Sequence, residues 1–176
     1  MIKLKDLLLE GKPPSIFIPR RIEDRIERMI KTYIRNGNKG SLNLSDLKLT
    51  VLPEILKDIT VGGNFFCFNN NLTLLINAPS SVDGTFDCSR NKLTSLINAP
   101  KYVDGTFYCH YNNLTSLKGL KETVINENFY CTDNKLTSLE GAPKTVNGHF
   151  FCYQNPVKFT EDQVRAVSDV KGMVGV

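Results

Sequence analysis

All five cysteines of the chain occupy the same position of an internal repeat, and this regularity restricts the folds open to the sequence. Successive cysteines are separated by 21, 21, 22 and 21 residues. They are Cys67, Cys88, Cys109, Cys131 and Cys152. A period of about 20–29 residues is typical of solenoids, in which each repeat forms one coil and stacked coils share a continuous core.

The neighbours of each cysteine repeat with it. A phenylalanine lies two residues before: Phe65, Phe86, Phe107, Phe129 and Phe150. An asparagine lies three residues after: Asn70, Asn91, Asn112, Asn134 and Asn155. Apolar residues recur at six before, five after and eight after, as in Val82, Leu93 and Leu96 around Cys88. A looser first copy places Leu42, Leu44, Leu47, Leu49 and Leu52 in the Phe, Cys, Asn and two Leu positions.

This spacing predicts one short strand per coil. Phe-x-Cys alternates with period two, so both side chains point to the same side of a strand, which is the core. The asparagine can bond backbone groups where the chain leaves the strand. Two leucines then return along the back of the coil, and pairs such as Ala78-Pro79 mark the turn that follows.

The pattern resembles the leucine-rich repeat family, whose hallmark is Leu-x-x-Leu-x-Leu-x-x-Asn-x-Leu. Phe and Cys stand where that family usually has leucine, as in Thr-Phe-Asp-Cys-Ser-Arg-Asn-Lys-Leu at 85–93. The likeness covers residues 40–158, and the repeat variant resembles short repeats found in bacterial and bacteriophage proteins. It is also similar to the repeats of secreted bacterial effectors, which often carry a ubiquitin-ligase domain that this chain is too short to hold. The resemblance implies a parallel sheet on the concave side, an irregular convex side, and a binding role without chemistry.

Helical caps are expected at both ends of the solenoid. Residues 1–39 form an N-terminal segment with a capping helix, whose apolar stripe is Ile22, Ile26, Met29, Ile30, Tyr33 and Ile34. Asn36-Gly37 is expected to end it, and the apolar stretch 16–18 is expected to dock. Residues 159–176 are predicted as a C-terminal cap, with a helix over 161–171 and Val164, Val167 and Val170 facing inward. Thr160 and Gln163 have capping-box spacing, with Phe159 and Val164 as a hydrophobic staple.

Composition favours a single folded domain. The 176 residues are 41% hydrophobic, and no apolar run approaches the ~18–20 residues of a membrane span. No signal peptide is visible, and reduced cysteines fit a cytoplasmic setting, or the host cytoplasm or virion for a phage protein. The net charge of +4 belongs to residues 1–40, which hold ten basic and five acidic residues. We read the basic positions as the solvated face of one helix and expect no nucleic-acid partner; the candidate residues are Arg21, Arg25, Arg28 and Lys31.

Signals for an enzyme or a cofactor are lacking. Five equivalent cysteines facing a core offer no accessible, activated nucleophile. Zinc would need convergent ligands, but the sequence has no Cys-x-x-Cys pair, and its two histidines are His110 and His149. Cysteines stacked in register have parallel Cα–Cβ bonds, so we expect free thiols. We therefore predict no catalytic site, no metal and no cofactor.

The outward positions beside each cysteine supply the candidate site. Aromatic residues are concentrated there, and exposed aromatic side chains are frequent binding hot spots. The candidate partner-binding residues are Phe66, Phe68, Asp87, Arg90, Tyr108, His110, Tyr111, Tyr130, Phe151 and Tyr153. The same aromatics could instead only shield the strands, since they also have high strand propensity. The leading hypothesis is a non-enzymatic protein-binding module; a structural component of a larger assembly such as a phage particle and a glycan-binding protein are the alternatives. The oligomeric state stays open.

Overall fold

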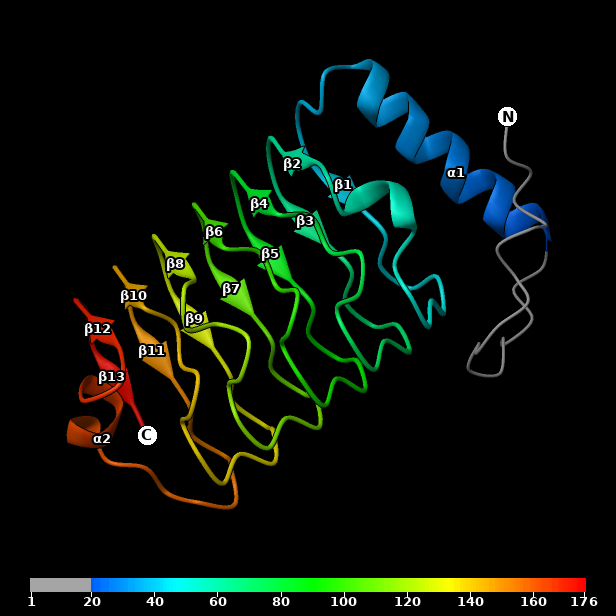
Figure 1. Cartoon of the computed structure of the whole chain (residues 1–176). Coiled ribbons are helices and arrows are strands. Elements are labelled where there is room, and N and C mark those ends of the chain that lie inside the picture. The colour runs from blue at the N-terminus through cyan, green and yellow to red at the C-terminus, as the bar shows by residue number, and fades with distance from the viewer. Residues whose placement is uncertain (1–19) are drawn as a thin grey trace.

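A computed structural model describes residues 20–176 and shows a solenoid with two parallel sheets side by side along its length (Figure 1). The seven-stranded sheet consists of β1 (Leu42–Asn43), β3 (Phe65–Phe66), β5 (Phe86–Asp87), β7 (Phe107–Tyr108), β9 (Phe129–Tyr130), β11 (Phe150–Phe151) and β13 (Val174–Gly175). The six-stranded sheet consists of β2 (Thr60–Val61), β4 (Ser81–Val82), β6 (Tyr102–Val103), β8 (Val124–Ile125), β10 (Thr145–Val146) and β12 (Asp169–Val170). The solenoid fold with parallel strands that the repeat predicts is confirmed.

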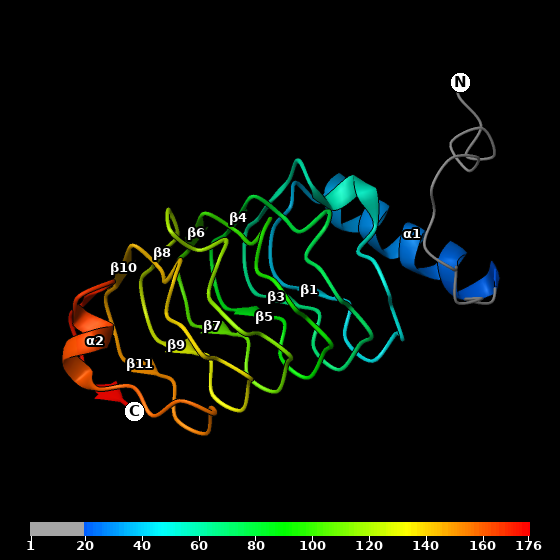
Figure 2. The same cartoon turned by 60° about the horizontal axis from the view of Figure 1, so that its bottom comes forward.

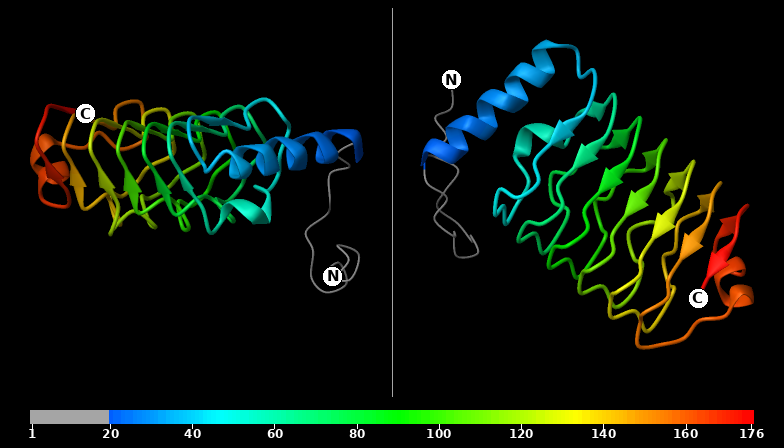
Figure 3. Two further views of the ribbon diagram at one scale, coloured as in Figure 1. Left: turned by 90° about the horizontal axis from the view of Figure 1, so that it is seen from above. Right: turned by 180° about the vertical axis from the view of Figure 1, so that it is seen from behind.

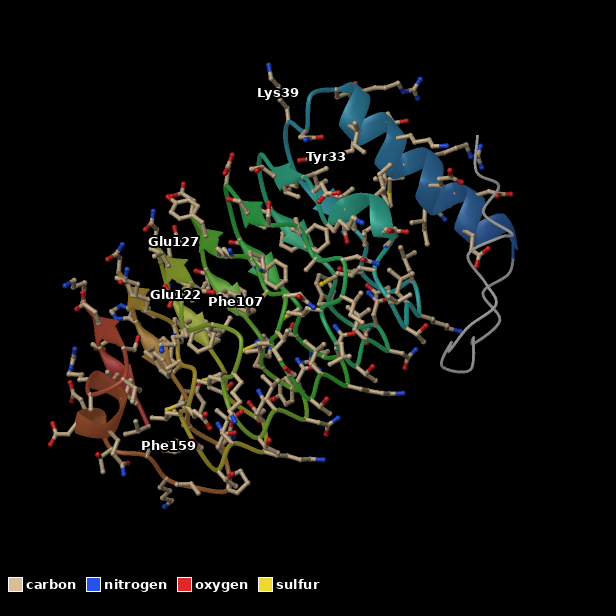
Figure 4. The ribbon with its side chains drawn as sticks, viewed as in Figure 1. Tyr33, Lys39, Phe107, Glu122, Glu127 and Phe159 are labelled. Carbon is tan, nitrogen blue, oxygen red and sulfur yellow. The ribbon has the colours of Figure 1, made fainter. Side chains whose placement is uncertain are left out.

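The core consists of the residues that repeat with the cysteines. All five cysteines and the five phenylalanines two residues before them are at most 2% exposed. Neighbouring phenylalanine rings contact one another along the solenoid with centroids 4.8–5.7 Å apart, from stacked at 12° for Phe65 and Phe86 to edge-on at 77° for Phe107 and Phe129. Figure 4 shows Phe107 pointing into the interior of the coils. The loose first copy is in register too, because Leu42 pairs with Phe65 and Leu44 is fully buried. Cysteine therefore serves here as a small apolar side chain.

The second sheet was not predicted. Five of its strands, β2 to β10, end on the apolar residue six positions before the cysteine, such as Val82, and these residues are fully buried. A bend of three residues separates it from the next strand of the first sheet. Successive coils touch in this bend: a Cβ at Gly105 would lie 2.7 Å from the backbone nitrogen of Thr85, although Glu127 is accommodated at the same position of a later coil. The rest of each coil, which carries the two leucines, lacks regular strands, as expected.

The N-terminal helix α1 (Arg20–Arg35) lies at the first coil (Figures 1 and 2). Ile26, Ile30 and Tyr33 are buried against that coil, and the Tyr33 hydroxyl accepts a hydrogen bond from the Gly62 amide at 3.0 Å. The helix ends before Asn36-Gly37, as predicted, with Gly37 at a φ of 73°. Arg21, Ile22 and the stretch 16–18 lie outside the residues whose side chains the structure describes.

The C-terminal cap differs from the prediction. Helix α2 (Glu161–Arg165) begins with the expected capping box between Thr160 and Gln163, and Phe159 and Val164 are both buried. It ends after five residues, so a helix continuing to Lys171 with Val167 inward is wrong: Val167 is 48% exposed.

The chain after α2 instead adds β12 and β13 to the two sheets (Figure 3). Arg165 donates to the carbonyls of Val170 and Gly172 at 2.6 and 2.9 Å. A further strand in each sheet satisfies the backbone groups of β10 and β11, which a surface helix could not do. A short 3-10 helix, η1 (Glu54–Leu56), lies on the return path of the first coil.

Candidate functional site

The outer face of the seven-stranded sheet holds the residues predicted for binding. Tyr111 and Tyr153 are 46% and 43% exposed, and Arg90 is also exposed. The others are half-buried side chains with one edge at the surface: Phe66, Phe68, Asp87, Tyr108, His110, Tyr130 and Phe151. The position after the cysteine does not face solvent in every coil, since Ser89 and Thr132 are only 3% and 5% exposed. Their side chains are too short to reach past the larger residues of adjacent coils.

Three aromatic rings form a stack across the last strands of this face, which we call the aromatic stack. Tyr108 and Tyr130 pair across β7 and β9, with ring centroids 4.9 Å apart and planes 20° apart. Tyr130 and Phe151 continue it at 4.7 Å and 25°. At the far end the Phe151 ring leans over Gly175, where a Cβ would lie 2.5 Å from the ring. Because each strand pairs with its neighbour in register, the backbone holds these rings in place before any ligand binds.

A second group of rings lies beside the stack. His110 contacts Tyr108 edge-on at 5.6 Å and Tyr111 at 5.4 Å between centroids. The guanidinium of Arg90 lies 4.6 Å from the centre of the Tyr111 ring, within the range of a cation–π contact. Burial lowers the pKa of His110 below its usual value. The positive charge of Arg90 also lowers this pKa, whereas the negative charges of Asp87 and Asp133 raise it by less than burial lowers it. The imidazole is therefore neutral at pH 7.

The aromatic stack stops at β5, and a hollow opens there. In this coil the outward side chains are Asp87 and Ser89, both small beside the Tyr108 and His110 of the next coil. The hollow has a volume of about 360 Å³. Its lining residues are Phe68, Asn69, Asp87, Ser89, Arg90, Tyr108 and His110. We call it the Asp87 slot.

The turn that follows each cysteine on this face has a left-handed backbone. The residue two positions after has a φ of 52–61° in all six coils from Asp46 to Gln154. Non-glycine residues pay roughly 1–2 kcal/mol in this conformation, less for Asn and Asp. Asp46, Asn69 and Asp133 are tolerant residues; the turn itself was predicted from the asparagine three positions after the cysteine. Arg90 and Tyr111 are not tolerant, yet they occupy the same position.

The turn on the back of the coil provides a comparison. Ten positions after the cysteine, the φ angle is again positive, between 67° and 117°. Only asparagine and glycine occur there: Asn77, Asn98, Gly119 and Gly141. The front turn therefore carries side chains that local backbone preference would not choose.

Other surfaces offer less. Between Glu23 and Arg35, α1 carries four basic and three acidic side chains, and Lys31 pairs with Glu27 at 2.6 Å, so this part of the helix has no strong positive patch. Glu122 and Glu127 point outward from the coil that they share (Figure 4). No group of three or more His, Cys, Asp or Glu side chains within residues 20–176 is arranged to bind a metal. Over the same residues, no helix has the length and apolar character to cross a membrane.

Comparison with known proteins adds a likeness of overall shape. No protein-family model matches the chain, and a search of curated proteins found no match. Among solved structures, a leucine-rich-repeat domain of a Shigella effector is similar, with 16% sequence identity and a TM-score of 0.44 over 91% of this chain and 92% of that one. The structure of the chain defines its fold class: parallel strands in coils of about 21 residues, with an asparagine in each turn, form a leucine-rich-repeat-like solenoid. Solenoids of this class serve typically as interaction modules.

Proposed function

We propose that this protein is a non-enzymatic interaction module that binds a protein partner through the outer face of its seven-stranded sheet. The observation that carries the proposal is the aromatic stack of Tyr108, Tyr130 and Phe151 at a partly exposed surface. Aromatic side chains bury a large area on binding and lose little rotamer entropy. Here the neighbouring rings already restrict one another, which lowers the ordering cost of association further.

The left-handed turns support the same face. Arg90 and Tyr111 hold a backbone conformation that costs roughly 1 kcal/mol or more each, although asparagine or glycine would fit at the same φ. Backbone strain of this kind is found preferentially at functional positions. The two side chains contact each other, and Arg90 also lines the Asp87 slot.

The two alternatives are distinguished by the chemistry of this face. Binding of a sugar uses the flat face of an aromatic ring, but in the aromatic stack the faces of Tyr130 are covered by Tyr108 and Phe151. Only the face of Tyr108 turned away from Tyr130 remains open to a sugar ring, so the arrangement favours a protein partner over a glycan. A structural component of a larger assembly would use the same surface as a binding module, and the two differ in whether the captured partner is one protein or a multicomponent particle.

Partner capture tests the proposal. The immobilised protein is exposed to lysate of its source cells, and bound proteins are identified by mass spectrometry. The double variant Tyr108→Ala/Tyr130→Ala removes two rings of the stack and should lose the captured partner. Tyr102→Ala is the matched control, because Tyr102 is 38% exposed but lies on β6 of the other sheet. Circular dichroism verifies that both variants fold, and a folded double variant that captures the partner as well as the wild type contradicts the proposal.

A further inference from the structure

The Asp87 slot is a one-strand gap between aromatic walls. Phe68 follows β3, and Tyr108 and His110 belong to the coil of β7, so the walls stand on strands two spacings apart. Parallel strands lie ~4.8 Å apart, which puts the walls about 9.6 Å from each other. A flat group placed midway would lie about 4.8 Å from each wall, within the ~6 Å at which a cation is attracted to a ring. The side of the Tyr108 ring that faces away from Tyr130 borders this gap.

The floor of the slot is a carboxylate that lacks a cationic partner. Asp87 Oδ1 accepts a hydrogen bond from the Ser89 amide at 2.9 Å. Within the described residues, Asp87 forms no salt bridge. The nearest cation, Arg90, is instead held over the ring of Tyr111. The second carboxylate oxygen is therefore available to a ligand.

Charge on the whole face favours a basic partner. The outward positions next to the cysteines carry three acidic residues, Asp46, Asp87 and Asp133, and one basic residue, Arg90, a net charge of −2. The complete chain has a net charge of +4. These outward positions are thus net negative on a protein whose net charge is positive.

We propose that the Asp87 slot receives the guanidinium group of an arginine from the partner protein. The planar guanidinium would lie between Phe68 and the Tyr108–His110 pair, extend the aromatic stack by one layer, and donate to Asp87. A lysine ammonium could reach the carboxylate but cannot stack between two walls, because it is not planar. This inference rests on the proposed binding role of the face and names the side chain that anchors the partner.

The test uses small probes and amide spectra of the whole protein. Nα-acetyl-arginine methylamide is titrated into ¹⁵N-labelled protein, alongside the citrulline analogue, which has nearly the same shape without the charge. We expect saturable shifts of the Ser89, Arg90 and His110 amides with the arginine probe, with a Kd on the order of 1 mM. The citrulline probe should give no saturable shift. Equal responses to the two probes, or no response to arginine, overturn the inference.

Variants locate the effect. Asp87→Asn removes the charge, and it should fold because Asn43 already makes the same hydrogen bond to Ser45 in the first coil, at 2.9 Å. It should raise the Kd for the arginine probe about tenfold. Asp87→Tyr fills the slot with the residue type of the next two coils and should abolish binding. Asp133→Asn removes an equal charge from the same face and should leave the Kd for the arginine probe unchanged. If this control loses as much affinity as Asp87→Asn, the effect is one of general electrostatics and the arginine site in the slot is refuted.

The inference and the proposed function fail separately. If the partner is captured through Tyr108 and Tyr130 but the arginine probe does not bind, the interaction surface stands and its arginine anchor is wrong. If the probe binds through Asp87 but no protein is captured, the slot stands and the proposed function is wrong. Shifts that respond to an acidic probe and depend on Arg90 would replace the arginine with a carboxylate, and so refute the inference.

Discussion

The buried asparagine ladder should contribute measurably to the stability of the coils, and Asn112 offers the sharpest test. Its Oδ1 accepts a hydrogen bond from the Leu93 amide of the previous coil at 2.9 Å. Its Nδ2 donates to the carbonyls of Cys88 and Cys109, each at 3.1 Å. One side chain thus connects two coils at a site that is 7% exposed.

The contacts that remain after Asn112→Ala set the magnitude. The Cys88 carbonyl still accepts from Asn91 at 3.1 Å, and the Cys109 carbonyl still accepts from Asn134 at 3.0 Å. The Leu93 amide has no second acceptor among the described residues. A buried donor left without a partner costs about 1–3 kcal/mol. With the lost donor bonds of Nδ2, we expect the free energy of unfolding to fall by about 2–4 kcal/mol.

Urea unfolding followed by circular dichroism measures this loss, and Asn113→Ala is the matched control. Asn113 is the next residue and is half-buried, and its side chain makes no hydrogen bond within the described structure, so its loss should stay within about 0.5 kcal/mol. Hydrogen exchange adds a local measurement, because the Leu93 amide should lose protection in Asn112→Ala. Equal stabilities of the two variants, or an unchanged Leu93 amide, would refute the account of the ladder.

Two further predictions concern the backbone and the thiols. Lys48 lies four residues after Leu44, which fills the cysteine position of the first coil, and it has a φ of 57°. Lys92 lies four residues after Cys88 and does not have a positive φ. Lys48→Gly should therefore raise the free energy of unfolding by about 0.5–1 kcal/mol, and Lys92→Gly should lower it by a similar amount. Thermal melts measure both changes. A change of the same sign in the two variants would contradict the left-handed backbone at Lys48. Burial raises the pKa of all the cysteine thiols, to about 11 for Cys152 and well above the usual value for Cys109. Alkylation of the folded protein at pH 8 should therefore be slow and should begin at Cys152. First labelling at Cys109 would contradict this order. Unfolded protein without reductant should show five free thiols.

The repeat carried most of the fold information because its chemistry is local. The alternation of Phe and Cys defines the inward side of each strand, and the asparagine defines the turn, so register followed from spacing alone. The six-stranded sheet was missed because each of its segments repeats only one buried apolar residue, such as Val82, without the Phe-x-Cys alternation that marks the first sheet. Two residues show no periodicity. That segment forms a strand because the equivalent segments of adjacent coils lie beside it.

The C-terminal segment shows a competition between local and tertiary preferences. The capping box and the staple correctly placed the start of α2. Its end was misjudged because Val164, Val167 and Val170 fit a helical stripe, while the preceding coil offers open strand edges at β10 and β11. Pairing with those edges satisfies backbone groups that a longer helix would leave exposed.

The sequence by itself determined the coil, its core and the face on which the candidate binding residues lie. It could not determine the Asp87 slot, because a gap exists only in relation to the walls that other coils supply. Asp87 and Ser89 are ordinary polar residues in the sequence; they form a floor because register places Tyr108 and His110 on one side and Phe68 on the other. Period and chemistry are properties of one repeat, whereas a site belongs to the stacking of several, and that stacking is a tertiary property.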